Sequence, residues 1–263
     1  MKFPIYQVDA FTDEAFKGNP AAVVPLENWL SDAQMQAIAL ENNLSETAFL
    51  VREGDGAFAI RWFSPMTEID FCGHATLASA FVLLEQRLAT PPLTFRAAAV
   101  GDIQVQQVED GLLEMDFPNL APKPVEHPPA ELLKGLGLAP QAVLCSGQAW
   151  FAVYEHEDQV RQISPDLAAL KALAPLDVVV TAPGVAHDFV SRYFWPANGG
   201  DEDPVTGSIH AGLAPYWSDR LGKSSLRAHQ ASRRGGELRC RVDGDRVRVA
   251  GHAVLYLQGS IHI

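Results

Sequence analysis

The segment Cys72-Gly73-His74 places a thiol, a glycine and an imidazole directly before an apolar run. Glycine lets a ligand approach the backbone closely, and the free N–H groups at a helix start favour a bound anion. An imidazole at that place is expected to stay neutral and to donate or accept a hydrogen bond. The segment predicts a helix start that binds a carboxylate or a phosphate, with His74 as a catalytic candidate. For a glycine taken alone, a tight entry into a buried helix is the simpler explanation.

A second segment follows the same plan, because Asp203 precedes the pair Gly207-Ser208 and a further apolar run. Two equivalent helix starts favour one anionic small molecule bound between two halves of the chain. Asp203 stands directly before Pro204, which is also typical of a helix cap followed by proline in the first turn. We expect Gly207 and Ser208 to bind the substrate. Asp203 either caps the helix, orients a catalytic group, or does both.

Glu46 and Cys72 are the remaining candidates for chemistry. If strand alternation begins at Glu46, its side chain shares a face with Ala48 and is held against apolar surface, which would suit it to proton transfer. An exposed loop position fits its spacing as well. A thiol at a helix start gains reactivity, but a racemase with two thiols needs a second cysteine where this chain has Thr206. Cys72 and His74 are two residues apart and their side chains need not meet, so we expect Cys72 to be packed and catalytically optional.

These segments lie in an internal repeat of residues 61–84 and 192–217. Both copies begin with Arg-aromatic-Phe, continue through a proline and an acidic loop to a glycine, and end in an apolar helix. Each helix is apolar nearly all round, which predicts burial on every side. The repeat therefore predicts two similar halves, each built around a central helix.

Short alternating or β-branched runs predict the strands, and serine caps predict two surface helices. The predicted strands are Ile5–Val8, Ala21–Val24, Ala57–Phe63, Leu112–Phe117, Asp177–Thr181 and Arg246–Leu257, and the helices are Ser31–Asn42 and Ser164–Leu173. The proline-rich stretch 119–129 is expected to link an N-terminal half, 1–118, to a C-terminal half, 130–255, with the last residues joining the first half. The expected fold class is α+β, as two pseudo-symmetric half-barrels of mixed sheet.

Composition excludes several classes of protein. The 263 residues are 48% hydrophobic, which excludes a disordered chain, and the net charge of −12 argues against nucleic-acid and membrane partners. The three cysteines have no paired spacing, and no signal peptide or membrane span is evident, so we expect reduced thiols and a cytoplasmic protein. No nucleotide or metal motif is present, and the acidic turn 198–203 is more typical of a solvated loop than of a cation site. We expect no cofactor.

Five motifs are distributed along the chain: Val8–Thr12, Gly18–Pro20, Asn43–Glu46, Phe71–His74 and Glu202–Ser208. Together they resemble the PhzF-like (phenazine biosynthesis-type) isomerase family, which has the diaminopimelate epimerase fold. The resemblance implies two pseudo-symmetric halves with the site between them, a biosynthetic acid/base reaction without cofactor, and commonly a homodimer. It assigns site roles to Glu46 as general acid/base and to Asn19, Gly73, His74, Asp203, Gly207 and Ser208.

The sequence thus predicts an isomerase that shifts a proton in a small carboxylate substrate, with Glu46 carrying the proton. The epimerase branch of this fold uses two opposed cysteines, whereas this chain offers only Cys72, which favours a hydrogen shift or tautomerisation over inversion. Two alternatives stay open. One is an amino-acid racemase or epimerase that pairs Cys72 with a different base, and the other is a small-carboxylate-binding protein without turnover.

Overall fold

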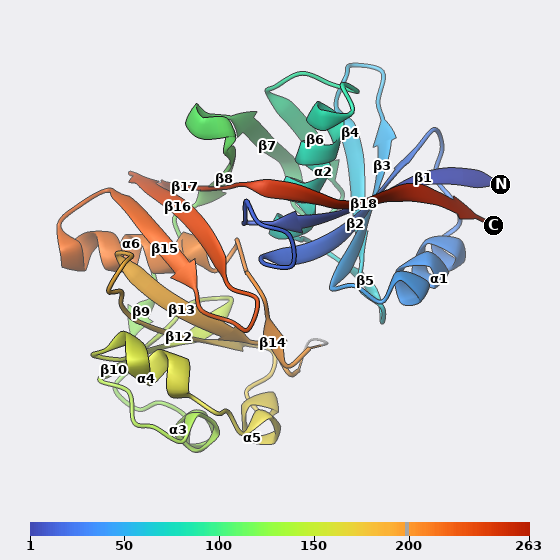
Figure 1. Cartoon of the computed structure of the whole chain (residues 1–263). Coiled ribbons are helices and arrows are strands. Elements are labelled where there is room, and N and C mark those ends of the chain that lie inside the picture. The colour runs from blue at the N-terminus through green and yellow to red at the C-terminus, as the bar shows by residue number, and fades with distance from the viewer. Residues whose placement is uncertain (198–199) are drawn as a thin grey trace. The chain divides into compact units, whose positions relative to one another are not determined.

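The computed structural model describes residues 1–197 and 200–263 and divides the chain into two compact units. Unit 1 consists of Met1–Asp116 and Ala250–Ile263, and unit 2 consists of Phe117–Val249. The chain therefore leaves unit 1, builds unit 2 and returns. Figure 1 shows the N and C ends side by side in unit 1, as the pairing of Lys2 with His262 requires.

Unit 1 is a mixed sheet with one buried helix and one outer helix. Its strands are β1 (Lys2–Ala10), β2 (Asn19–Leu26), β3 (Glu46–Arg52), β4 (Phe58–Phe63), β5 (Glu68–Ile69), β6 (Leu93–Ala97), β7 (Gly101–Gln107), β8 (Leu113–Pro118, ending in unit 2) and β18 (Ala253–His262); its helices are α1 (Asp32–Asn42), α2 (Gly73–Glu85) and the 3₁₀ turn η1 (Glu109–Gly111). Neighbouring strands pair in the order β18-β1-β2-β3-β4-β6-β7-β8. Only β2/β3 and β4/β6 are parallel in this series, and β5 pairs with β4.

Unit 2 repeats this plan. Its strands are β9 (Lys123–Pro124), β10 (Ala142–Cys145), β11 (Ala149–Val153), β12 (Asp177–Pro183), β13 (Phe189–Phe194), β14 (Glu202–Asp203), β15 (Ser225–Gln230), β16 (Gly236–Asp243) and β17 (Arg246–Gly251); its helices are α3 (Ala130–Leu136), α4 (Glu157–Gln162), α5 (Leu167–Lys171) and α6 (His210–Leu221). The order β9-β10-β11-β12-β13-β15-β16 has parallel pairs at β11/β12 and β13/β15, and β14 pairs with β13. The direction of every pair matches its counterpart in unit 1, as expected for a duplicated fold.

An arginine–carboxylate pair recurs at the same point of both units. Arg61 on β4 binds both oxygens of Glu68 on β5, at 2.7 and 2.6 Å. Arg192 on β13 binds both oxygens of Glu202 on β14, at 2.7 and 2.9 Å. Each guanidinium also lies over the phenylalanine two residues later, with its Cζ 5.2 Å and 5.0 Å from the ring centroid. The Arg-aromatic-Phe repeat thus ties each short acidic strand to its sheet in a planar, two-bond geometry.

Each half was expected to contain one central helix, and both of these helices, α2 and α6, are largely buried, as predicted. In α2 every residue from Gly73 to Ala80 is buried, and in α6 every residue from His210 to Pro215 is buried. Helix α2 packs against β1, β2, β3 and β18, and α6 packs against β15 and β16. Because both helices lack a solvated face, their burial removes apolar side chains from water all round, at about 1.5–3 kcal/mol for each large one.

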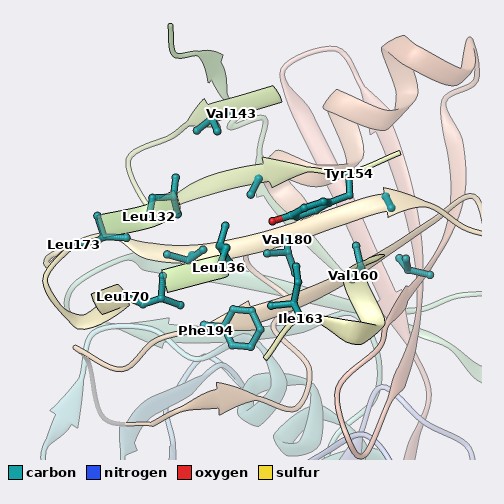
Figure 2. Packing of buried hydrophobic residues seen from close by; sticks show 14 residues of the cluster. Leu132, Leu136, Val143, Tyr154, Val160, Ile163, Leu170, Leu173, Val180 and Phe194 are labelled. Atoms are coloured by element: carbon teal, nitrogen blue, oxygen red, sulfur yellow. The ribbon is translucent and has the colours of Figure 1, made fainter. Parts of the chain in front are cut away.

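A second core in unit 2 holds the outer helices to the sheet (Figure 2). Leu132 of α3, Val160 of α4 and Leu170 of α5 pack with Val180 of β12 and Phe194 of β13. All five side chains are almost completely removed from solvent. This layer therefore anchors the face of β12 and β13 that carries the Arg192 pair.

Five of the six predicted strand runs fall on single strands, which extend up to three residues beyond the predicted ends, and one prediction is wrong. The run Arg246–Leu257 is not one strand but two, β17 and β18, separated at His252. The backbone oxygen of His252 accepts hydrogen bonds from the N–H groups of Phe11 and Thr12, at 2.8 and 3.2 Å. The strand breaks there because the chain passes from unit 2 into unit 1 and is held by the loop after β1.

Of the two predicted serine caps, the one at Ser31 is confirmed and the one at Ser164 is wrong. Ser31 caps α1 in a capping box with Gln34, as expected. Ser164 does not cap α5, because Asp166 accepts the hydrogen bond of Ala169 N–H and starts the helix after Pro165. Among the described residues, no helix is both long and apolar enough to cross a membrane.

Residues 119–129, expected to be a linker, lie inside unit 2 and are bonded to it. Leu120 N–H donates to the backbone oxygen of Ala211 in α6 at 3.0 Å. Strand β9 pairs with β10, and Val125 N–H donates to the backbone oxygen of Val143 at 2.9 Å. Proline limits this segment to a short edge strand but leaves enough backbone donors to attach it.

The Arg192 pair gives a testable prediction for stability. The side chain of Arg192 is 12% exposed. Its Nη1 atom, which does not bind Glu202, donates to the backbone oxygens of Ile163 and Val160, at 2.7 and 3.2 Å. Arg192→Ala leaves these acceptors unmatched, so we expect the free energy of unfolding in urea to fall by roughly 2–4 kcal/mol. Arg61→Ala is the matched control, because Arg61 is more exposed and pairs with side chains; its loss is expected near 1 kcal/mol. Equal losses in both variants would contradict this account.

Candidate active site

Three elements of unit 1 meet around Glu46. Glu46 is the first residue of β3 and Asn19 the first residue of β2. These strands are parallel neighbours, with Ala21 opposite Glu46, so both strands begin at the same edge of the sheet. Helix α2 packs on both strands, and its first turn brings His74 to this edge. The site is therefore set by where two parallel strands and the central helix start.

The side chains of Glu46, His74 and Asn19 form a buried cluster. The Nε2 atom of His74 lies 3.0 Å from Oε2 of Glu46, with the side chains only 6% and 4% exposed. The amide nitrogen of Asn19 lies 3.1 Å from Nδ1 of His74. Because an amide N–H donates, Nδ1 accepts from Asn19, and Nε2 is the ring nitrogen that faces the carboxylate. Within the described chain, Oε2 of Glu46 receives no well-aligned hydrogen bond.

Cys72 lies closer to this cluster than the sequence suggested. It is the N-cap residue of α2, and its Sγ lies 3.4 Å from Nδ1 of His74. The extended backbone at Cys72 turns its side chain toward the imidazole, so the expectation that these side chains need not meet is corrected. Donor atoms of Glu46, Cys72 and His74 all lie within 4.8 Å of one another, the closeness that a metal site requires. The expectation of a reaction without metal or cofactor stays a prediction.

The loop before Asn19 holds that residue in place, and sequence reasoning missed two of its parts. The carboxylate of Asp9 is buried and accepts the backbone N–H of Phe16 at 2.8 Å. Gly18 has φ +63°, and a Cβ there would overlap the backbone oxygen of Ala10. Only glycine satisfies both conditions, which accounts for the glycine in Gly18-Asn19-Pro20.

In unit 2, Asp203 belongs to the short strand β14 and pairs with Tyr193. Its Oδ2 accepts the hydroxyl of Thr206 at 2.5 Å. It does not cap the helix: the residue at the cap position of α6 is Ile209, and no side chain caps the first turn. The capping interpretation of Asp203 is therefore wrong, because the loop after β14 is longer than one cap requires.

The helix start at Gly207-Ser208 also differs from the prediction. Regular α-helix begins at His210. The three residues before it form a tighter turn with i to i+3 hydrogen bonds; for example, His210 N–H donates to the backbone oxygen of Gly207 at 3.1 Å. In α2, by contrast, Gly73 is the first helical residue, as expected. The Oγ of Ser208 accepts the amide of Gln148 at 2.9 Å. A 3₁₀ turn at this end of a helix still presents its first backbone N–H groups outward.

Gln230 was not found by sequence reasoning, although it fixes the loop that carries Asp203. Its side chain is fully buried on β15. The amide nitrogen donates to the backbone oxygen of Asp203 at 2.8 Å, and the amide oxygen accepts Thr206 N–H at 2.9 Å. A glutamine on a strand gives no signal of this role, because its partners lie more than twenty residues earlier.

Each unit thus gathers its own set of predicted residues. Unit 1 brings together Asn19, Glu46, Cys72, Gly73 and His74, and unit 2 carries Asp203, Gly207 and Ser208 on the loop between β14 and α6. Of the acidic turn 198–203, residues 198 and 199 lie outside the described residues.

Comparison with known proteins decides the family. The family model described as phenazine biosynthesis-like protein, PhzC-PhzF, matches residues 8–259. The chain belongs to the PhzC-PhzF family. This family member is 50% identical over 263 residues, covering 100% of both chains, to an uncharacterized isomerase of Pseudomonas aeruginosa. The sequence resemblance stated above is confirmed.

Solved structures agree with this assignment. A PhzF-family protein of Enterococcus faecalis superposes with a TM-score of 0.95 at 47% identity, covering 100% of each chain. A predicted epimerase of Pseudomonas aeruginosa, 24% identical over 98% of this chain and 99% of its own, has a TM-score of 0.75 and shares the fold. The α+β fold class of this PhzC-PhzF member, of the epimerase-like kind, is confirmed.

The buried imidazole of His210 predicts a pH dependence of stability. Burial lowers the pKa of His210 to about 4, while its Nδ1 lies 2.9 Å from the oxygen of Thr206. In the unfolded chain the pKa returns to 6.5, so between pH 6.5 and 4 the unfolded state binds more protons and stability falls as pH falls. This one group should remove about 2 kcal/mol of unfolding free energy between pH 7 and pH 5.

Urea unfolding at the two pH values measures this effect. His210→Gln should lose that part of the pH dependence, whereas His156→Gln, at a side chain 71% exposed, should keep it. An NMR titration of the wild-type imidazole gives a second readout that does not depend on the variant. A His210 resonance that titrates near pH 6.5 would overturn the prediction.

Proposed function

We propose that this member of the PhzC-PhzF family is a cofactor-independent isomerase that removes a proton from carbon and returns it at another position. Glu46 is the general acid/base. The substrate is a small molecule with a carboxylate and an activating group beside the reacting carbon. The observation that carries the proposal is the buried carboxylate of Glu46, 3.0 Å from the imidazole of His74.

The surroundings of Glu46 support a role in proton transfer. The carboxylate of Glu46 is shielded from water, and a nearby hydrogen-bond donor would stabilise its charged form. The Nε2 atom of His74 lies 3.0 Å from the carboxylate, within reach of such a hydrogen bond, although none is well aligned among the described residues. In the proposed reaction the carboxylate takes a proton from carbon and becomes neutral while the negative charge passes to the substrate, and the proton is then returned at the other position.

The loop and helix start of unit 2 are proposed to bind the substrate's carboxylate. Backbone N–H groups at Gly207 and Ser208 would meet the anion, aided by the positive end of the α6 dipole. Asp203 is proposed to orient a polar substituent, held by Thr206 and Gln230. Donors placed at a developing negative charge contribute a few kcal/mol each, on the order of 3 kcal/mol, in the transition state.

One observation favours a second candidate function. Because Sγ of Cys72 lies 3.4 Å from His74, the thiol has a base within reach, as a racemase or epimerase acting through Cys72 would need. Cys72→Ala distinguishes the two functions. The isomerase keeps turnover within about tenfold of wild type, whereas the racemase loses turnover by about two orders of magnitude or more.

The direct test of Glu46 uses heavy water. The purified protein is incubated in D₂O with a panel of small carboxylates, including dihydro-hydroxyanthranilate and amino acids, and carbon-bound deuterium is followed by NMR. Wild type is expected to place deuterium at one carbon of one substrate class. Glu46→Gln should reduce the rate at least about 100-fold, because the amide cannot carry the proton.

Glu114→Gln is the matched control. Glu114 is another buried glutamate of unit 1, hydrogen-bonded to Gln106 at 2.8 Å, and its replacement should leave the exchange rate within a few fold. Substantial turnover in Glu46→Gln would contradict the assignment of Glu46 as the general acid/base. Saturable binding without exchange across the whole panel would instead favour a carboxylate-binding protein.

A further inference from the structure

Two histidines and a glutamate meet at the rim of unit 2, outside the predicted site residues. His229 on β15 and Glu237 on β16 are directly opposite each other in the antiparallel pair. His187 lies in the turn between β12 and β13, and that turn reaches β15 because Phe189 pairs with Ala228. The β12–β13 turn and the two strands of the β15–β16 hairpin therefore contribute one side chain each.

The donor atoms of this cluster already converge. The Nε2 atom of His187 lies 2.7 Å from Oε2 of Glu237, and Nδ1 of His229 lies 3.1 Å from Oε1. One donor atom of each residue lies within 4.8 Å of the others. The two rings are nearly parallel, at 20°, with centroids 5.1 Å apart. Ligand atoms on a tetrahedral metal ion stand about 3.4 Å apart, so the two nitrogen–oxygen distances need to lengthen only modestly to admit an ion.

The segments that carry these side chains are held by hydrogen bonds of their own. Asp188 N–H donates to the backbone oxygen of Arg227 at 2.8 Å, and the carboxylate of Asp188 accepts Arg227 N–H at 2.7 Å. Val185 N–H donates to Glu157 at 2.7 Å. These contacts fix the turn around His187 against β15 and α4, as the supporting residues of metal sites fix their ligands.

Charge and access at the cluster also suit a cation. Glu237 directs one carboxylate oxygen to each imidazole, so all three side chains face the same point. Glu237 is about half exposed, which leaves a path for an ion and for water to complete its coordination. Two imidazoles and one carboxylate are typical ligands of Zn²⁺ and neighbouring divalent metals.

We propose that His187, His229 and Glu237 bind a divalent transition-metal ion, with Zn²⁺ as the ion tested. The ion would join the β12–β13 turn to the β15–β16 pair and act as a clamp on unit 2. This inference is independent of proton transfer by Glu46, because no residue is shared.

Isothermal titration of the full chain with ZnCl₂ at pH 7.5, after treatment with a chelator, tests the proposal. We expect one binding event at this cluster, and dissociation constants at least about 100-fold weaker in His229→Gln and about 10- to 100-fold weaker in Glu237→Gln. His156→Gln is the control, since this exposed histidine of unit 2 is not part of the cluster. Zn²⁺ should also raise the melting temperature of wild type but not of either cluster variant.

A second measurement separates this cluster from Glu46, Cys72 and His74. Co²⁺ bound through a thiolate gives an intense near-ultraviolet charge-transfer band, which binding to imidazole and carboxylate lacks. Co²⁺ binding without that band, unchanged in Cys72→Ser, is expected. No measurable Zn²⁺ binding, or binding unaffected by the double variant His187→Gln/His229→Gln, overturns the proposal; circular dichroism confirms that each variant is folded.

Discussion

The burial of the Glu46 carboxylate is the constraint on which the candidate active site depends. Removing an ionised group from water costs several kcal/mol unless a partner of suitable charge or hydrogen-bonding capacity replaces the solvent. His74 is the group that lies nearest in this role, with its Nε2 3.0 Å from the carboxylate and its Nδ1 in contact with Asn19. The starting points of β2, β3 and α2 must therefore coincide to within a residue. This requirement explains why the glycine before Asn19 cannot carry a side chain, since any shift of β2 would separate the amide from the ring.

The duplication supplies a scaffold, while the chemistry differs between its two copies. Both units share the same series of strand directions and the same arginine–carboxylate pair beside the short acidic strand. At the equivalent helix start, however, unit 1 carries Cys72 and His74 and unit 2 carries Thr206 and Ser208. Only unit 1 places a buried carboxylate next to an imidazole there, among the described residues. In the proposed function, proton transfer falls to unit 1 and anion binding to unit 2, the two copies of one fold.

Sequence patterns predicted the parts of this fold that depend on local chemistry. Apolar character on all sides identified both central helices, and the Ser31 cap identified α1. One pattern failed where a distant partner decides the outcome, because two N–H groups of the β1 loop bind His252 and interrupt a β-like run. Another failed locally, because Asp166 and not Ser164 caps α5. For the site, motif and spacing selected Glu46 and His74, yet they could not reveal the contact between them or the support from Gln230, which depend on tertiary packing.

In the sequence, unit 2 is inserted between the two segments of unit 1, and this determines the order in which the ribosome completes the two units. Unit 2 is complete once Val249 has been synthesised, whereas unit 1 waits for Ala250–Ile263. Strand β1 is made before unit 2, but its partner β18 is made after it. Throughout elongation, β1 presents an open sheet edge, the kind of surface that pairs with a neighbouring chain. The nascent protein is thus exposed to misassembly at the edge of β1 until β18 has been made.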